Sequence, residues 1–404
     1  MTLSLPATRV AVTDIPHLDT PDPFVRRLPT EPDNIPRIEL PSGHTAICLS
    51  GYADVRALMF DDTASRALCN VDGGPSFMPT NWAPEVLINL DAPVHGVMRR
   101  FVSHEFSARA MAEWVPIVQG LTLAACAEFE HADAPDLVRD VFTLVPAQTV
   151  CTLLGVPLER ARWMNGLGRI VQRADRDDID GIGEAWGQLW GWVEALIAGE
   201  AEHNDTGLIS IYKRRRAERE YATDVDAGLL AGTLMGVILG GDNNVATMLS
   251  KTTYAALAHP QLYRRVTAAP EREVPKLVEE ILRLMPLGTP GSFPRQLVNP
   301  LSTSFGELPA GRIVYPHINA ANRDPAVFAD PLAIDLDRPP NKHLQYGYGM
   351  HRCMGSALAQ MALITVLRTV VSRYPSLALA AQPEEVPWDF GIGLRRPSEL
   401  AVTL

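Results

Sequence analysis

The chain has 404 residues and a formal net charge of -11, with 47% hydrophobic and 21% charged residues. These proportions are ordinary for a soluble globular protein with a sizeable core, and the negative balance argues against nucleic acid as a partner. We expect no membrane attachment, because residues 1–36 form a proline-rich coil without an apolar run of signal-peptide or anchor type.

The expected elements are mostly helical. After the coil, a short strand is predicted at residues 44–49, and alanine- and leucine-rich segments with helical period extend from residue 52 to residue 284. Short strands follow Pro286, one of them at residues 312–315, and a helix is predicted at residues 356–372. The sequence shows no repeat and no low-complexity linker.

Three helical segments carry polar or glycine-rich patterns. His95 and Arg99 are four residues apart and therefore share a helix face, as do Glu280 and Arg283 at a spacing of three. Between them, residues 227–250 are apolar and are interpreted as one buried helix, whose first part, about fifteen residues, is too short for a membrane span. Each pair alone is a weak signal, because surface helices often carry such pairs.

A glycine-rich loop at residues 346–355 places Cys353 just before the last long helix. Glycines let the backbone turn tightly and approach a flat macrocycle, while freed amide groups can point at the sulfur. A thiolate there could hold a haem iron and favour cleavage of the dioxygen bond. A lone cysteine is more often a small buried hydrophobe, so the interpretation depends on the other motifs.

The loop resembles the haem-binding loop of the cytochromes P-450, whose pattern is aromatic-x-x-Gly-x-x-x-Cys-x-Gly. Tyr346 stands where that family usually has phenylalanine, Gly349 and Gly355 match the glycines, and Cys353 matches the iron ligand. The resemblance spans essentially the whole chain. It implies the mainly α fold of that family with a small β region, as a single haem-thiolate domain over residues 1–404, and haem b (iron protoporphyrin IX) as the cofactor.

The resemblance also assigns the other polar residues. Haem propionates need cationic or hydrogen-bonding partners when they leave water, and the positions that match the family's partners are His95, Arg99, Arg295 and His351. Glu280 and Arg283 match a buried structural pair, which meets the segment that contains Asn322 and Phe328.

The central helix departs from the family pattern of an acid followed by an alcohol. Counting back from residues 259–260 puts Asn243 at the acid's place and Asn244 at the threonine's. A carboxamide does not ionise near neutral pH, so Asn243 cannot be a carboxylate proton relay, whereas Asn244 can order a water molecule. Asp242 could supply the carboxylate, although it lies roughly 100° around the helix; a slip of one residue would restore an Asp242–Asn243 pair.

The substrate pocket is the least defined part. Matching the family's pocket segments gives the candidates Met78, Trp82, Leu239, Gly240, Gly291, Phe293 and Ile392. Four tryptophans at positions 163, 186, 190 and 192 could stack on an aromatic substrate. A helical aromatic stripe more often faces the core.

The implied function is oxidation of a small organic molecule with dioxygen, by hydroxylation of a substrate such as a natural-product intermediate. The alternative is oxidative C–C or C–N coupling of an aromatic substrate, for example a tryptophan-containing cyclic dipeptide, without oxygen insertion. A protein that only binds a haem ligand receives no support from these motifs.

Electrons are expected from a separate ferredoxin and ferredoxin reductase. The five cysteines have no paired spacing, which favours reduced thiols and a cytoplasmic protein.

Overall fold

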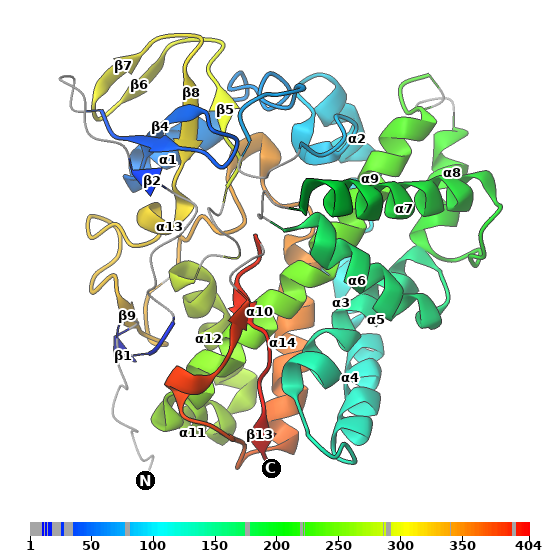
Figure 1. Ribbon diagram of the computed structural model, residues 1–404, viewed down its shortest axis with the longest axis vertical. Coiled ribbons are helices and arrows are strands. Elements are labelled where there is room, and N and C mark those ends of the chain that lie inside the picture. Colours follow the sequence, from blue (N-terminus) through cyan, green and yellow to red (C-terminus); the bar gives the residue numbers. More distant parts are fainter. Residues whose placement is uncertain are drawn as a thin grey trace.

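The structure is a computed structural model. It describes residues 10–11, 13, 15–17, 26–27, 35–76, 81–173, 178–218, 221, 223–285, 287, 292–339, 341–389 and 393–404. Helices fill most of the molecule, and a small sheet lies at one end of it (Figure 1). The prediction of a mainly α protein with a small β region is confirmed; the prediction of one domain stays a prediction.

The helices are α1 (Tyr52–Phe60), α2 (Val94–Ser103), α3 (Ala108–Ala112), α4 (Val115–Phe129), α5 (Leu144–Leu154), α6 (Ala161–Val171), α7 (Ile179–Ala198), α8 (Leu208–Arg216), α9 (Ala227–Gly241), α10 (Asn243–Leu257), α11 (Pro260–Ala268), α12 (Pro270–Leu284), α13 (Ile318–Ala321) and α14 (Ser356–Arg373). Shorter helical turns are Leu87–Asn89, Val138–Phe142, Leu158–Arg160, Gly349–His351 and Pro383–Glu385. The helix expected at residues 356–372 is therefore present with nearly those bounds.

The strands are β1 (Val10–Ala11), β2 (Arg26–Arg27), β3 (Arg37–Glu39), β4 (Thr45–Leu49), β5 (Arg295–Gln296), β6 (Leu301–Thr303), β7 (Gly306–Leu308), β8 (Ile313–Pro316), β9 (Ala333–Ile334), β10 (Ala378–Leu379), β11 (Trp388–Asp389), β12 (Arg396–Pro397) and β13 (Val402–Thr403). The largest sheet has the order β2-β3-β4-β8-β5, in which β4 and β8 are parallel. It joins the two strands expected at residues 44–49 and 312–315.

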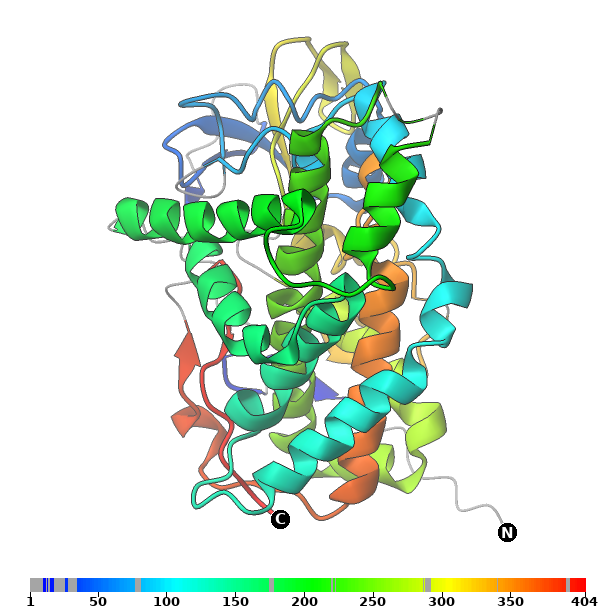
Figure 2. The same cartoon turned by 90° about the vertical axis from the view of Figure 1, so that its right-hand side faces the viewer.

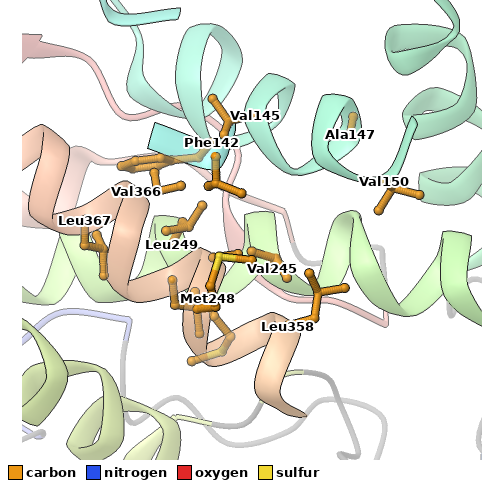
Figure 3. Close-up of a cluster of buried hydrophobic side chains, with 14 of the residues drawn as sticks. Phe142, Val145, Ala147, Val150, Val245, Met248, Leu249, Leu358, Val366 and Leu367 are labelled. Carbon is orange, nitrogen blue, oxygen red and sulfur yellow. The ribbon is translucent and has the colours of Figure 1, made fainter. Parts of the chain in front are cut away.

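The main core is built where α5, α10 and α14 meet (Figure 3). Val145 and Val150 of α5 face Val245 of α10, and Leu358 of α14 closes the same cluster. Every residue of α10 except Asn244 is buried. Because an α-helix that is buried all round must lie inside the protein, α10 forms the centre around which the other helices pack (Figure 2).

The interpretation of residues 227–250 as one helix is wrong. Helix α9 ends at Gly241 and α10 begins at Asn243, with Asp242 between them at φ -96° and ψ -85°, outside helical geometry. Helix α9 also approaches the chain near Glu85 so closely that a Cβ atom at Gly232 would lie 2.3 Å from the Glu85 carbonyl oxygen. At the break the run Gly240-Gly241-Asp242-Asn243-Asn244 interrupts the apolar pattern. These glycines and short polar residues are a local sign of the break that the apolar residues on either side do not give.

Glu280 and Arg283 form a buried pair on α12. Arg283 Nη2 donates to Glu280 Oε1 at 2.8 Å, and the same guanidinium donates to the carbonyl oxygens of Asn322, Pro331 and Ala333. Glu280 in turn accepts from Arg338 Nε at 2.9 Å and from Asn341 Nδ2 at 3.0 Å. The pair therefore ties α12 to the segment 322–341.

None of the described helices is by itself long and apolar enough to cross a membrane. The bent pair Val94–Ala112 and Val115–Phe129 reaches that length and composition only when its two parts are taken together.

We predict that Arg283→Leu lowers the free energy of unfolding by about 3–5 kcal/mol, because it removes one of the two arginines that pair with the buried Glu280 carboxylate and leaves the carbonyl oxygens of Asn322 and Pro331 without that donor. Urea unfolding of the purified protein measures the change. Lys276→Leu is the matched control on the same helix. Its ammonium pairs with Asp337 at 3.2 Å and with the buried Glu273 at 3.5 Å, and Glu273 keeps Arg265 and Arg272 as partners, so we expect a change below about 1 kcal/mol. Equal effects of the two substitutions would contradict the structural role of Arg283.

Candidate active site

A cavity of about 400 Å³ lies beside the broken central helix. Its walls come from α2, α9, α10 and the start of α14, together with the loop at residues 345–355 and the segment before β5. Most of its surface is apolar, with contributions from Val86, Leu87, Phe106, Val237, Val245, Met248, Leu282, Leu358 and Leu363. It is the size of a small-molecule or cofactor site.

Cys353 opens onto this cavity, whereas Cys48, Cys69, Cys126 and Cys151 are buried in the protein. The loop is held by the Cys353 amide, which donates to the Tyr346 carbonyl oxygen at 2.7 Å. Gly349 has φ +69°, and a Cβ atom there would lie 2.3 Å from the Met59 carbonyl oxygen at the end of α1. Glycine at this position thus lets the loop pack directly on α1.

The thiol of Cys353 is tuned by opposing effects. Burial raises its pKa, while a hydrogen bond from the Gly355 amide and the charges of Arg99 and Arg352 lower it, and the balance is a raised pKa. A raised pKa favours the neutral thiol in the free protein, and a metal ion bound at the sulfur would deprotonate it, because metal coordination deprotonates a thiol outright.

One part of the cavity wall is strongly basic. Four arginines and two histidines line it, and none of the described lining residues is an aspartate or glutamate: the basic residues are Arg66, Arg99, Arg295, Arg352, His95 and His351. Burial lowers the pKa of Arg66 and of Arg295 to about 10. We call the first three arginines and the two histidines the basic cluster.

Several atoms of the basic cluster have no hydrogen-bond partner within the described part of the chain. These atoms are Arg295 Nη1, Arg66 Nε and both ring nitrogens of His351. The rings of His95 and His351 lie 4.5 Å apart, and burial, followed by the nearby arginines, lowers the pKa of His95 to about 4. Buried unpaired donors beside like charges indicate an anionic ligand that would pair with them.

Asn244 lines the cavity, but Asp242 and Asn243 do not. Both turn toward α6, where Asn165 Nδ2 donates to Asp242 Oδ1 at 2.8 Å and to Asn243 Oδ1 at 3.2 Å. The roles of Asp242 and Asn243 in the reaction stay predictions, and in this structure any such role would act from outside the cavity wall. The break between α9 and α10, rather than a rotation along one helix, sends these two side chains away from the cavity.

The remaining sequence candidates separate into three groups. Tyr346, Gly355, Trp82, Leu239, Gly240 and Phe293 line the cavity with Cys353 and the basic cluster. Gly349 lies in the loop behind the wall and contacts α1. Met78, Gly291 and Ile392 lie outside the described residues.

A model of the cytochrome P-450 family matches residues 274–400. The nocardicin C N-oxygenase of Nocardia uniformis subsp. tsuyamanensis is 30% identical over 369 residues, which cover 91% of this chain and 92% of that protein. The chain belongs to the cytochrome P-450 family. It is therefore an oxidoreductase of a monooxygenase family whose cofactor is haem iron, and both the predicted family and the predicted enzyme class are confirmed.

Two further relatives of this cytochrome P-450 cover nearly all of it. The biflaviolin synthase of Streptomyces coelicolor is 31% identical over 409 residues, covering 97% of this chain and 96% of that protein. The crystal structure of cytochrome P-450mel, described as having biaryl coupling reactivity, superposes with a TM-score of 0.83 at 28% identity and covers 89% of this chain and 91% of that one.

The residues of this cytochrome P-450 fit a haem. Its thiol and its basic cluster share one apolar cavity, and the cluster's unpaired donors suit the two carboxylates of that macrocycle. Sequence reasoning missed Arg66, because no motif surrounds it; only the fold brings it beside Arg295. It also missed Gln172, which ends α6 and lines the cavity.

The tryptophan stripe has a mixed outcome. Trp163, Trp186, Trp190 and Trp192 pack partly buried against the core and are not among the cavity-lining residues. Trp82 does line the cavity: its ring stacks on Trp186 with centroids 6.2 Å apart and meets Phe293 edge-on at 6.0 Å. The four tryptophans therefore belong to the core, as the core interpretation states. Trp186 packs against Trp82, and we call the two cavity-lining residues Trp82 and Phe293 the aromatic corner.

Burial raises the pKa of Asp242 from its ordinary value of 3.8 to about 7, against the opposing effects of the Asn165 hydrogen bond and the charge of Arg396. A raised folded-state pKa means that the folded protein holds this proton more tightly than the unfolded chain. The resulting stability is complete below about pH 4 and is lost as the pH rises to about 7.

We predict that Asp242→Asn removes this pH dependence. Denaturant unfolding of the wild type at pH 4 to 8 should show a loss of roughly 4 kcal/mol attributable to Asp242, and the difference between wild type and variant isolates it. Two stability curves that run parallel across this range would show that the Asp242 carboxyl titrates normally.

Proposed function

We propose that this cytochrome P-450 binds haem b through Cys353 Sγ and uses dioxygen to hydroxylate a small organic molecule, such as a natural-product biosynthetic intermediate. The observation that carries the proposal is the shared cavity, in which an accessible thiol and an acid-free basic cluster lie within apolar walls. When bound, the thiolate-ligated haem iron supplies the activation of dioxygen.

The protein's own residues have three tasks in this proposal. His95, Arg99, Arg295 and His351, joined by Arg66, hold the propionates and offset the cost of burying their charges. The apolar residues of α9, α10 and α14 exclude water and hold the substrate. Asn244, the one polar residue that α10 presents to the cavity, donates hydrogen bonds there.

Electrons would come from a ferredoxin and a ferredoxin reductase that dock near Arg352. Arg352 is exposed, and its carbonyl oxygen accepts a hydrogen bond from Arg99 Nη1, so the outer surface is directly connected to the basic cluster. The free cysteines, four of them buried, support a reducing compartment such as the cytoplasm.

The second candidate is oxidative coupling of an aromatic substrate without oxygen insertion. The aromatic corner of Trp82 and Phe293 favours it, because aromatic rings bind one another in stacked and edge-on arrangements. Two of the relatives described above are a biflaviolin synthase and a protein with biaryl coupling reactivity. The nocardicin C N-oxygenase is named as an oxygenase and therefore supports the first candidate, oxygen insertion.

We predict that Cys353→Ala abolishes the thiolate-type absorption of the ferrous carbon monoxide complex, because the variant has no sulfur at the iron. Cys151→Ala is the control, since Cys151 is buried in α5 away from the cavity and its loss should leave that absorption unchanged. A thiolate-type band that survives in Cys353→Ala would assign the ligand to another residue and overturn the proposal.

The two candidate reactions are separated by optical titration of the ferric protein with aromatic cyclic dipeptides and with terpenoids or fatty acids. We predict that Trp82→Leu weakens the affinity for the aromatic panel, measured by the spin-state shift, about two- to tenfold, since aromatic pairs contribute roughly 0.5–1.5 kcal/mol beyond area burial. Trp163→Leu, outside the cavity wall, should have no effect. A shift with the aliphatic panel alone would leave hydroxylation as the function.

A further inference from the structure

The carboxamide of Asn244 is held by a second carboxamide. Gln172 directly follows α6, is 6% exposed and lines the same cavity. Its Nε2 atom donates to the Leu239 carbonyl oxygen at 3.2 Å and to Asn244 Oδ1 at 3.3 Å. One amide group therefore contacts both sides of the break between α9 and α10.

The hydrogen bonds to Leu239 and Asn244 determine how the side-chain amides of Gln172 and Asn244 are oriented. A backbone carbonyl oxygen can only accept, so the Gln172 atom facing Leu239 must be its nitrogen. That nitrogen uses its other hydrogen toward Asn244, which must then present its oxygen to Gln172. The Asn244 nitrogen is left with no hydrogen bond inside the described part of the chain, on a half-buried side chain that lines the cavity.

The need for Gln172 follows from the helix break. Leu239 lies in the last turn of α9, where carbonyl groups lack partners within the helix. Asn165, Gly168 and Gln172 lie on one face of α6, at spacings of three and four residues. A Cβ atom at Gly168 would lie 2.9 Å from Asn243 Nδ2, so this face is shaped to receive the broken helix.

We propose that Gln172 is a positioning residue that keeps the Asn244 oxygen toward α6 and both Asn244 N–H bonds toward the ligand in the cavity. The inference rests on the proposed function, since it assigns a direction to the polar group beside the haem ligand. A hydroxyl at this position could both donate and accept, whereas an amide fixed in this way only donates. Asn244 therefore donates hydrogen bonds to an acceptor in the cavity. Its oxygen is turned to Gln172 and does not accept a hydrogen bond there.

The test is the carbon–oxygen stretching frequency in the infrared spectrum of the ferrous carbon monoxide complex, which falls when a donor points at the bound oxygen atom. Gln172→Leu removes the amide that orients Asn244. Gln172→Glu, measured at a pH high enough to ionise the new carboxyl group, offers Asn244 only acceptors, which turns its nitrogen toward α6. Asn244→Leu removes the donor altogether. Each of the three changes should raise the frequency, or split the band, relative to wild type.

The double variant Gln172→Leu with Asn244→Leu separates positioning from general packing. If Gln172 acts through Asn244, the double variant gives the same frequency as Asn244→Leu alone. A Gln172→Leu spectrum identical to wild type overturns the inference, as does an equal shift in both backgrounds. Gln172→Glu gives an independent reading should Gln172→Leu fold poorly. A wild-type protein without a thiolate-type carbon monoxide band would overturn the haem proposal and this inference together, whereas the other negative results overturn the inference alone.

Discussion

The buried pair of Glu280 and Arg283 determines where the cysteine loop can lie. Removing two charges from water is costly, so such a pair persists only when every remaining donor and acceptor is satisfied. Here the segment 322–341 supplies those partners through its carbonyl oxygens and through Arg338 and Asn341. Asn322 Oδ1 then accepts from the Leu344 amide at 2.7 Å, just before the loop begins. The start of the cysteine loop is therefore tied to α12 through Asn322, while the loop itself packs on α1 at Gly349.

The basic cluster, unlike the Glu280–Arg283 pair, has no carboxylate partner among the described residues of the cavity wall and lowers the stability of the fold. Like charges that are buried close together repel one another, and burial lowers the pKa of Arg66 and of Arg295 to about 10. The charge of Asp91 acts against this effect at Arg66 and Arg295, and that of Asp61 does so at Arg295. An anion bound in the cavity would add to this compensation, so binding of the anion and stability of the fold are linked. Since the cluster takes residues from α2, β5, the loop before Cys353 and the chain near Ser65, a ligand that pairs with it would hold four separate segments together.

Local features were predictable and tertiary ones were not. The glycine-rich loop, the spacing of Glu280 and Arg283 and the helix from Ser356 are written in neighbouring residues, so the sequence alone indicated them. Asp242 at the break accepts a hydrogen bond from Asn165, seventy-seven positions away in the chain, and only folding reveals this contact. The glycines and polar residues at 240–244 are the local sign of the break in the sequence. Arg66 and Gln172 stand in no motif; they matter because folding brings them to the cavity wall. The spacing of four residues puts Trp186 and Trp190 on one helix face, but it does not show that Trp82, which lies outside that helix, is the tryptophan that lines the cavity.

The polar contacts between α6 and the break between α9 and α10 have a further consequence for the cavity. Besides its two side-chain bonds, Gln172 accepts a hydrogen bond at its carbonyl oxygen from the Gly393 amide at 2.8 Å, and Gly393 and Leu394 also line the cavity. One residue thus anchors the amide of Asn244 and the start of the closing segment of the chain. The two attachments use different groups of the same residue, the side-chain amide toward Asn244 and the backbone carbonyl toward Gly393. A displacement of Gln172 would therefore strain both of them together.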